Sequence, residues 1–404
     1  MNYDNSEKWA KAQDQADPLC EFRSRFHLPP DTVYLAGNSL GLQPKTAREY
    51  IEIELDDWAK LAVEGHFKAR NPWVSYHELL TAQTARLVGA RPSEVVVMNT
   101  LTVNLHLMMV SFYRPTPERN KILIEADAFP SDQYAVASQA AFHGGEVVEL
   151  EQKEDPVARI ARDGSSIALV MLGNANYLTG EAFDMRTIAQ AAHAKGCVLG
   201  FNLAHGAGNL VLRLHDDDVD FAVWCSYKYL NAGPGGLAGC FIHERHAADK
   251  NLPRFAGWWG HNKGTRFRMD RVFDPIPGAE GWQLSNPPIF QLAALRASME
   301  IFDEATMPAI RQKSERLTGY LEFLFDRLPS GFCEIITPRE PQRRGSQLSL
   351  RIRGAKGLVA KLAAGGVICD FREPDIVRVA PAPLYNTFTD VWHCARVLEQ
   401  YASG

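Results

Sequence analysis

Residues 224–239 read WCSYKYLNAGPGGLAG and place one lysine, Lys228, between two tyrosines, after an apolar run and before a group of glycines. A lysine at the end of a buried strand is partly removed from water, and burial disfavours the ammonium and lowers its pKa. The neutral amine is a nucleophile that forms imines with carbonyl compounds. The ordinary alternative is a lysine whose stem packs while its ammonium reaches water. Lys228 is therefore a candidate Schiff-base lysine for a carbonyl cofactor.

The lysine stretch lies near the end of a long alternation of strand-like and helix-like segments, from about residue 75 to 245. Apolar runs typical of strands lie at 93–99, 120–129, 166–174, 197–205, 220–226 and 239–244, and segments with helical spacing lie at 79–90, 103–113, 131–144 and 185–196. This alternation predicts a mainly parallel sheet covered by helices on both faces. After about residue 287, two long amphipathic helices and a second α+β pattern predict a smaller C-terminal unit.

Composition excludes several classes of function. The chain has 404 residues, of which 46% are hydrophobic, and its net charge of −5 offers no basic surface for nucleic acid. The polar start lacks the apolar core of a signal peptide, and no apolar run is long enough to cross a bilayer. The seven cysteines are widely spaced without a Cys-x-x-Cys pair, so we expect reduced thiols and no metal site. These features predict a cytoplasmic protein without nucleic-acid or membrane partners.

Polar residues follow several of the predicted strands, where ligands bind in open α/β sheets. They are Asn99–Thr102, Phe129–Asp132, Asn174–Thr179, Asn202 with His205, and Ser226–Lys228. Helix capping explains Ser131 and Asp132 equally well when they are taken alone. No Walker loop or Gly-x-Gly-x-x-Gly is present, so nucleotide binding has weak support.

A helix that begins near Thr102 offers free backbone N–H groups to a single phosphate. Pyridoxal phosphate needs such a cradle, an imine-forming lysine, an aromatic plate and a partner for its pyridine nitrogen. Phe129 is the candidate plate, and His205 and Asn202 are candidate ring partners.

A set of longer motifs narrows the interpretation. In order, the chain contains VYLAGNSLGLQPK (33–45), MNTLTVNLHLMM (98–109), ADAFPSDQYA (126–135), GFNLAHGAGN (200–209), CSYKYLNAGPGGLAG (225–239), GWWGH (257–261), LSNPP (284–288) and RVAPAPLYN (378–386). From about residue 30 to 390 this series resembles the kynureninase family. The resemblance implies the α/β fold of PLP-dependent transferases of fold type I, with a mainly parallel seven-stranded sheet in a large domain and a smaller α+β C-terminal domain.

The resemblance also implies the extent of each unit and a homodimer with active sites at the subunit interface. Residues 1–65 would contribute to the small domain and to dimer contacts, 66–295 would form the large cofactor-binding domain, and 296–404 would form the small domain.

The resemblance implies a role for each candidate site residue. Lys228 and Tyr227 are implied as catalytic, although Tyr227 fits equally well as a phosphate ligand alone. The implied cofactor contacts are Leu101, Thr102, Phe129, Ser131, Asp132, Asn202, His205, Tyr227, Lys228, Trp258 and Asn286, with Trp258 and Asn286 reaching in from the second subunit. The implied substrate contacts are Arg378 at the α-carboxylate, and His66, Ser285, Asn286, Asn38 and Ser39. His66 fits an interface histidine equally well, and outside this motif Arg378 would be an ordinary surface ion pair.

The implied reaction is hydrolysis of L-kynurenine or 3-hydroxy-L-kynurenine to anthranilate or 3-hydroxyanthranilate and L-alanine, within tryptophan catabolism and NAD biosynthesis. The polar trio His66, Ser285 and Asn286 can satisfy a phenolic hydroxyl that an apolar pocket would leave unpaired. We therefore expect a preference for the 3-hydroxylated substrate.

The chain departs from the family pattern at Asn202, where the family has an aspartate that pairs with the pyridine nitrogen. Losing an opposite charge at contact shifts a pKa by about one to three units. We therefore expect slow turnover, unless another group such as His205 supplies the proton. Gly173 also replaces a serine found in animal members. Two alternatives remain open: a desulfurase-like β-eliminating enzyme, which would need a reactive cysteine such as Cys369, and an inactive PLP-binding homologue.

Overall fold

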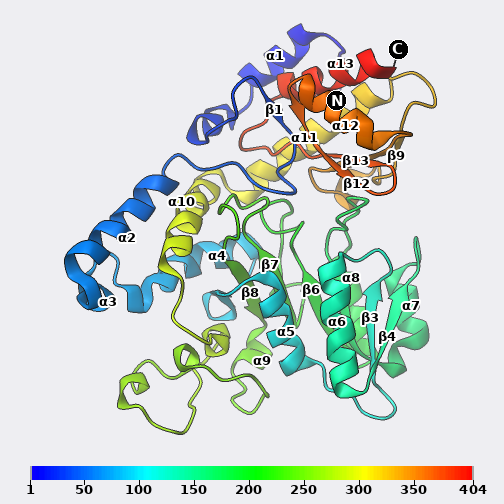
Figure 1. The fold of residues 1–404 in the computed structure, drawn as a ribbon. Helices are drawn as coiled ribbons and strands as arrows, with labels where there is room; N and C mark the ends of the chain where they lie inside the picture. The colour runs from blue at the N-terminus through cyan, green and yellow to red at the C-terminus, as the bar shows by residue number, and fades with distance from the viewer. Residues whose placement is uncertain (1, 403–404) are drawn as a thin grey trace.

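The computed structural model describes residues 2–402, and its main feature is a seven-stranded sheet of order β2-β8-β7-β6-β5-β3-β4 (Figure 1). Its strands are β2 (Val95–Val97), β3 (Lys121–Glu125), β4 (Glu146–Leu150), β5 (Ile167–Gly173), β6 (Val198–Asn202), β7 (Phe221–Cys225) and β8 (Ala238–Ile242). Only β8 runs against its neighbours, and the other neighbouring strands pair in parallel. The mainly parallel sheet expected from the βα alternation is confirmed.

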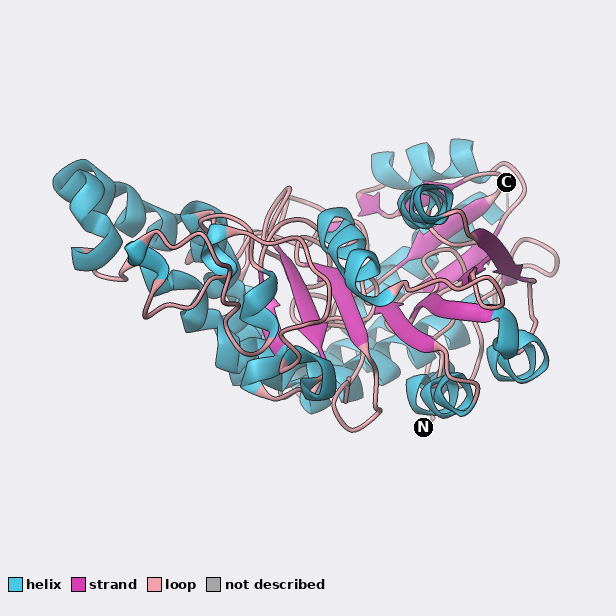
Figure 2. Cartoon of the chain, turned by 90° about the horizontal axis from the view of Figure 1, so that it is seen from below, coloured by secondary structure: helices cyan, strands magenta, loops and turns pink. Residues whose placement is uncertain are grey.

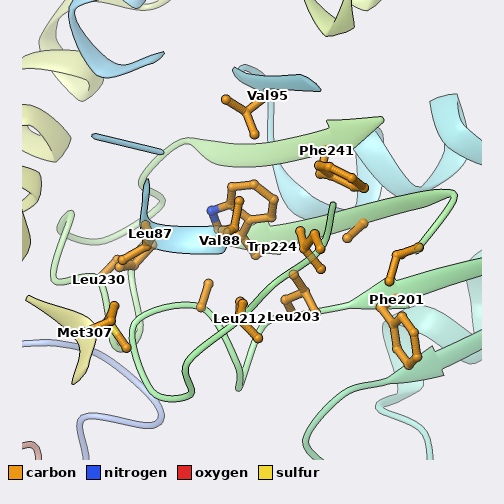
Figure 3. Packing of buried hydrophobic residues seen from close by; sticks show 14 of the residues in the cluster. Leu87, Val88, Val95, Phe201, Leu203, Leu212, Trp224, Leu230, Phe241 and Met307 are labelled. Atoms are coloured by element: carbon orange, nitrogen blue, oxygen red, sulfur yellow. The ribbon is translucent and has the colours of Figure 1, made fainter. Parts of the chain in front are cut away.

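Helices cover both faces of this sheet, because its strands are apolar on both sides. The helices are α4 (Thr81–Val88), α5 (Leu101–Phe112), α6 (Pro130–His143), α7 (Pro156–Asp163) and α8 (Met185–Ala194). Alternate residues of a strand point to opposite faces. In β2, Val96 packs in the core beneath α5 and α6, whereas Val95 and Val97 pack in the opposite core with α4 and α8. Figure 3 shows this second core, where Trp224 lies between the α4 residues Leu87 and Val88 and Phe241 of β8.

The edge strand β4 was not expected from the sequence. Its exposed residues Glu146 and Glu149 interrupt the apolar pattern that marks the inner strands. Edge strands carry charged residues that discourage pairing with other chains. The charged residues that suit β4 to the edge of the sheet are therefore also the reason why the sequence pattern did not predict it as a strand.

The second unit lies at one end of the large sheet, at the top of Figure 1 and at one side of the molecule in Figure 2. Its four-stranded sheet has the order β12-β13-β10-β9, and all its neighbouring strands are antiparallel. Its strands are β9 (Glu334–Ile335), β10 (Leu348–Arg351), β12 (Asp370–Arg372) and β13 (Ile376–Val379), and its helices are α11 (Met307–Phe325), α12 (Ala355–Ala364) and α13 (Phe388–Ala402).

The N-terminal segment packs into this smaller unit. Ala10 of helix α1 (Glu7–Gln15) packs in the same core as the C-terminal helices. Leu35, which follows strand β1 (Val33–Tyr34), packs there too. Strand β1 also pairs in parallel with β11 (Val367–Ile368). The first residues of the chain thus complete the core of the last ones.

The two cores meet along the long helices α10 (Ile289–Ala305) and α11. Leu292 and Phe302 of α10 and Ile310 of α11 belong to the large core, whereas Leu317 of α11 belongs to the small core. The boundary predicted between residues 295 and 296 lies within the range of α10 and stays a prediction.

A lobe formed by α2 (Ala47–Leu61) and α3 (Gly65–Lys68) projects beside the loops of residues 250–288, at the lower left of Figure 1. Helix α2 packs against α10. Among residues 2–402, no helix has both the length and the apolar character needed to span a membrane.

Candidate active site

The carboxyl ends of β2, β3, β5, β6 and β7 surround one cavity of ≈ 180 Å³. This is the edge where ligands bind in parallel α/β sheets. Nine of the residues expected to contact the cofactor line it: Leu101, Thr102, Phe129, Ser131, Asp132, Asn202, His205, Tyr227 and Lys228. The strand ends that the sequence marked as polar are therefore brought together.

Lys228 lies just beyond β7, with its Nζ 3.1 Å from His205 Nε2 and 5.7 Å from the centre of the Phe129 ring. Burial lowers the pKa of Lys228, and the nearby Arg378 lowers it further. Burial and the Lys228 charge hold the pKa of His205 well below its usual range. The neutral imidazole can therefore accept a hydrogen bond at Nε2 from the Lys228 amine. This is the depressed lysine pKa that the sequence analysis anticipated.

Asn202 and Asp132 form a buried pair in the wall of the cavity. Asn202 Nδ2 donates to Asp132 Oδ2 at 2.6 Å, and Asn202 Oδ1 accepts from the Ala204 N–H at 2.8 Å. Burial raises the pKa of Asp132 to about 6, against the opposing effects of Asn202 and Lys228.

Glu125, at the end of β3, is a second buried carboxyl in the cavity wall. Its Oε1 accepts from the Gly173 N–H at 2.6 Å and its Oε2 accepts from Asn176 Nδ2 at 2.9 Å. Burial raises the pKa of Glu125 to about 7, although these two donors oppose the shift. A Cβ added at Gly173 would lie 3.2 Å from Glu125 Oε1, so the glycine leaves room for this carboxyl.

The beginning of α5 provides an anion cradle. Thr100 precedes the helix in extended backbone, and within the described chain its side chain does not cap the helix. The first backbone N–H groups of a helix lack intrahelical acceptors and favour negative charge. Thr102 Oγ1 lies 2.8 Å from Ser131 Oγ, so hydroxyls from α5 and α6 meet at the same place. Such an arrangement suits one phosphate group.

Tyr227 presents its phenol to the cavity beside this cradle. Burial raises the pKa of Tyr227 to about 12, with a further contribution from Cys225. The hydroxyl therefore stays protonated at neutral pH and is available as a hydrogen-bond donor.

Arg378 lies on β13 in the small unit and is 1% exposed. Asp370 Oδ1 accepts from its Nε at 2.7 Å, Asp370 Oδ2 accepts from its Nη2, and the Tyr177 carbonyl accepts from its Nη1 at 2.8 Å. The two Asp370 contacts occupy the Nε–Nη2 edge of the guanidinium, and the Tyr177 carbonyl takes one of the two N–H groups of Nη1. One N–H on Nη1 and one on Nη2 remain for a carboxylate, a group that arginine binds well.

Seven expected site residues do not line this cavity in the single chain, and one of them is the buried Arg378. Trp258, Ser285 and Asn286 are exposed, and His66 is half-buried with its ring against Trp73. Asn38 is buried and donates to Gln347 Oε1 at 2.9 Å, and Ser39 follows it at the boundary between the two units.

The cavity wall also contains Glu125 and Cys225, which sequence reasoning did not assign to the site, and Asn176 and Tyr177 from the polar stretch 174–179 that it marked. Asp370, which pairs with Arg378, was not anticipated. Glu125 and Cys225 are the last residues of apolar strands. The same position at a strand end identified Asn202 as a candidate, so it could have identified these two residues as well.

Comparison with known proteins decides the family. The family model named Kynureninase C-terminal domain matches residues 310–398. The kynureninase of Myxococcus xanthus is 64% identical over 418 aligned residues, which cover 99% of this chain and 98% of that protein. The kynureninase of Koribacter versatilis is 58% identical, with 100% of this chain and 98% of that protein covered. The chain belongs to the kynureninase family.

The kynureninase-family assignment agrees with the fold. A solved structure of C-DES, with glycine covalently linked to its PLP cofactor, matches with a TM-score of 0.82 at 18% identity and covers 93% of this chain and 99% of that chain. This likeness shows the fold of type I PLP enzymes. The protein is a pyridoxal-phosphate-dependent hydrolase that acts on carbon–carbon bonds.

The residues of this kynureninase-family site fit pyridoxal phosphate. The partly buried Lys228 lines the cavity, and its amine lies 5.7 Å from the centre of the Phe129 ring. The start of α5 suits the phosphate. Asp132 Oδ1 is buried and has no hydrogen-bond partner within residues 2–402. A buried acceptor of this kind requires a donor, which a bound molecule can supply.

The desulfurase-like alternative is not supported by the cysteine it would need. Cys369 is 7% exposed, and burial raises its pKa to about 12. A reactive cysteine requires an accessible thiolate, whereas Cys369 is a buried neutral thiol.

Proposed function

We propose that this enzyme hydrolyses the Cβ–Cγ bond of 3-hydroxy-L-kynurenine, and of L-kynurenine less efficiently, with release of L-alanine. The other product is 3-hydroxyanthranilate or anthranilate, and the water supplies its carboxylate oxygen. The observation that carries the reaction is the buried Lys228 amine among five converging strand ends, in a chain that belongs to the kynureninase family.

Pyridoxal phosphate, when bound, supplies an electron sink for charge that develops at the substrate Cα. The protein's own groups position the substrate and move its protons. Arg378 binds the α-carboxylate through its free Nη1–Nη2 edge and so fixes the direction of the Cα–H bond. Lys228 Nζ, whose pKa is lowered by burial, is suited to accept that proton. The protonated Tyr227 hydroxyl is suited to donate a proton to the substrate Cβ as the Cβ–Cγ bond breaks and the aryl carboxylic acid departs.

We assign the aryl end of the substrate to His66, Ser285 and Asn286. These side chains are polar and at least partly exposed in the single chain. A site that hydrogen-bonds a phenol rejects the analogue that lacks it, because its own polar groups are then left unpaired. Asn38 and Ser39 lie at the mouth of this site in the same proposal.

The preference is tested by measuring kcat/KM for both kynurenines through the fluorescence of the anthranilate product. We expect the 3-hydroxylated substrate to be favoured by about ten-fold or more. Ser285→Ala should reduce this ratio, whereas Ser138→Ala, on the far part of α6, should leave it unchanged. Equal kcat/KM values for the two substrates would contradict the aryl-site assignment.

We further propose a homodimer in which each active site takes residues from both chains. Large apolar side chains are exposed on the α2–α3 lobe and the neighbouring loops: Trp58, Val63, Phe67, Phe255, Trp258, Phe267, Met269 and Val272. Exposed apolar clusters of this size are typical of interfaces. Phe67 and Phe267 lie with ring centres 5.8 Å apart, so the two segments form one surface. The expected phosphate ligands Trp258 and Asn286 belong to the same loops.

Mixing two inactive variants tests the shared site. Lys228→Ala removes the cofactor lysine, and Asn286→Ala removes a ligand that we assign to the partner's site. Heterodimers then contain one site with both residues intact, so unfolding and refolding the mixture should restore activity. A mixture that stays inactive, although light scattering shows a dimer, would place Asn286 in its own chain's site.

The proposal also covers the effect of Asn202 on turnover. We propose that the carboxylate missing at position 202 leaves the ring nitrogen incompletely protonated and slows turnover, so that Asn202→Asp raises kcat on both kynurenines by about ten-fold or more. Equal rates for the two proteins would contradict this.

We place the enzyme in the cytoplasm, where its seven free cysteines would stay reduced.

A further inference from the structure

We propose that in this chain Asp132 takes the place of residue 202 as the anion that faces the ring nitrogen of pyridoxal phosphate. The inference deepens the proposed function and rests on the cofactor lying in the cavity beside Lys228. It concerns the charge on the cofactor ring and can be tested without any substrate.

The hydrogen bonds of Asn202 prevent it from serving as the acceptor for the ring nitrogen. Its Oδ1 accepts the Ala204 N–H at 2.8 Å, which fixes the orientation of the amide. Its Nδ2 therefore points toward Asp132 and donates to Oδ2 at 2.6 Å. An amide nitrogen donates hydrogen bonds and accepts none. Residue 202 therefore offers the cavity only a hydrogen-bond donor, and a donor cannot accept the hydrogen bond of a protonated ring nitrogen.

The neighbouring carboxyl has the acceptor that Asn202 lacks. Asp132 is 8% exposed, lines the cavity, and uses Oδ2 for Asn202. Its Oδ1 is buried without a hydrogen-bond partner anywhere in residues 2–402. An unpaired buried carboxylate oxygen is unfavourable, and an N–H⁺ group is the donor that stabilises it best. Asn202 is then a positioning residue that holds the Asp132 carboxylate in place.

The other titratable groups of the cavity are already committed. Both oxygens of Glu125 accept hydrogen bonds, from the Gly173 N–H and from Asn176 Nδ2. His205 is paired with Lys228, and its pKa is held far below its usual range. Asp132 Oδ1 is therefore the free carboxylate oxygen among the cavity carboxyls of the described chain.

The charge balance supports the same assignment. Burial raises the pKa of Asp132 to about 6 although Asn202 and the Lys228 charge oppose the shift, so the carboxyl takes up a proton just below neutral pH. A positive ring nitrogen at contact favours the carboxylate, and the carboxylate favours the protonated ring by the same energy. The two groups therefore hold one proton between them near neutral pH.

The test follows the protonation of the ring nitrogen itself. The holoenzyme is prepared with pyridoxal phosphate labelled with ¹⁵N in the ring, and the ¹⁵N chemical shift is recorded against pH. In Asp132→Asn, which keeps the size of the side chain, we expect the apparent pKa of the ring nitrogen to fall by about one to three units. Asp127→Asn is the matched control, because Asp127 lies on the loop just before α6, outside the cavity wall, and accepts a hydrogen bond from Gln152 Nε2 at 2.7 Å.

A second pair of variants separates the charge from its position. In Asn202→Asp the ring has two carboxylate neighbours, so adding Asp132→Asn there should change the ring pKa much less than it does alone. The double variant should regain the protonation that Asp132→Asn loses, which also shows that a carboxylate is not needed at 132 for folding. An unchanged titration in Asp132→Asn, or equal shifts in both backgrounds, would overturn the inference. Failure of the proposed reaction would appear separately, as absence of an anthranilate product with the ring titration intact.

Discussion

Asp370→Asn tests how the substrate carboxylate is held. Asp370 faces Arg378 across the antiparallel strands β12 and β13, and its two oxygens accept from Nε and Nη2 of Arg378. An asparagine of the same shape can accept from only one of them and turns an N–H₂ group toward the other. One hydrogen bond between charged groups is worth about 1.5–3 kcal/mol. Since about 1.4 kcal/mol corresponds to ten-fold, kcat/KM should fall by about ten- to a hundred-fold.

The loss should appear mainly in KM, because the carboxylate is bound equally in the ground state and the transition state. The assay is steady-state turnover with excess cofactor, together with thermal unfolding to confirm that the variant is folded. A competitive inhibitor without a carboxylate should bind both proteins equally. Asp375→Asn is the control, because that residue lies 3.7 Å from Arg351 in a partly exposed pair. An unchanged KM in Asp370→Asn, or a loss that the carboxylate-free inhibitor shares, would refute the positioning role.

Three further predictions concern single side chains. Tyr227→Phe, measured at saturating cofactor, should lower kcat by about a hundred-fold, as expected for the loss of a general acid; a change in cofactor affinity alone would make the tyrosine a phosphate ligand only. Burial raises the pKa of Glu125 to about 7 from an ordinary 4.5, so the folded apoprotein binds this proton more tightly than the unfolded chain. Its stability should therefore fall as the pH rises from 4.5 to 7, and Glu125→Gln should flatten that slope in denaturant titrations. Cys369→Ser should keep kcat within about two-fold, whereas a catalytic cysteine would lose nearly all activity.

The large sheet was predictable because each of its inner strands and covering helices can be recognised from a short segment of sequence. Each inner strand is a short apolar run, each covering helix has its own amphipathic period, and parallel strands must bring their carboxyl ends to one edge. Asn202 and His205 lie at the end of β6, Lys228 follows β7, and the structure brings the three residues together. The depressed pKa of Lys228 likewise follows from its apolar flanks.

The pairings within the site were not predictable in the same way. Asn202 and Asp132 are 70 residues apart, and only the order β6-β5-β3 of the sheet and the start of α6 bring them into contact. The sequence suggested that His205 could replace the missing charge, but the structure pairs His205 with Lys228. Asp370 and Arg378 are eight residues apart across β12 and β13, a pairing that the short segment between them could have indicated.

The central claim is that Lys228 holds the cofactor covalently in the cavity at the strand ends. The most direct measurement is borohydride reduction of the holoenzyme, followed by proteolysis and mass spectrometry of the peptides. The account predicts a pyridoxyl group on the peptide that contains Lys228, and its loss in Lys228→Ala. A pyridoxyl group on a different lysine, or none on a protein that carries the cofactor, would contradict it.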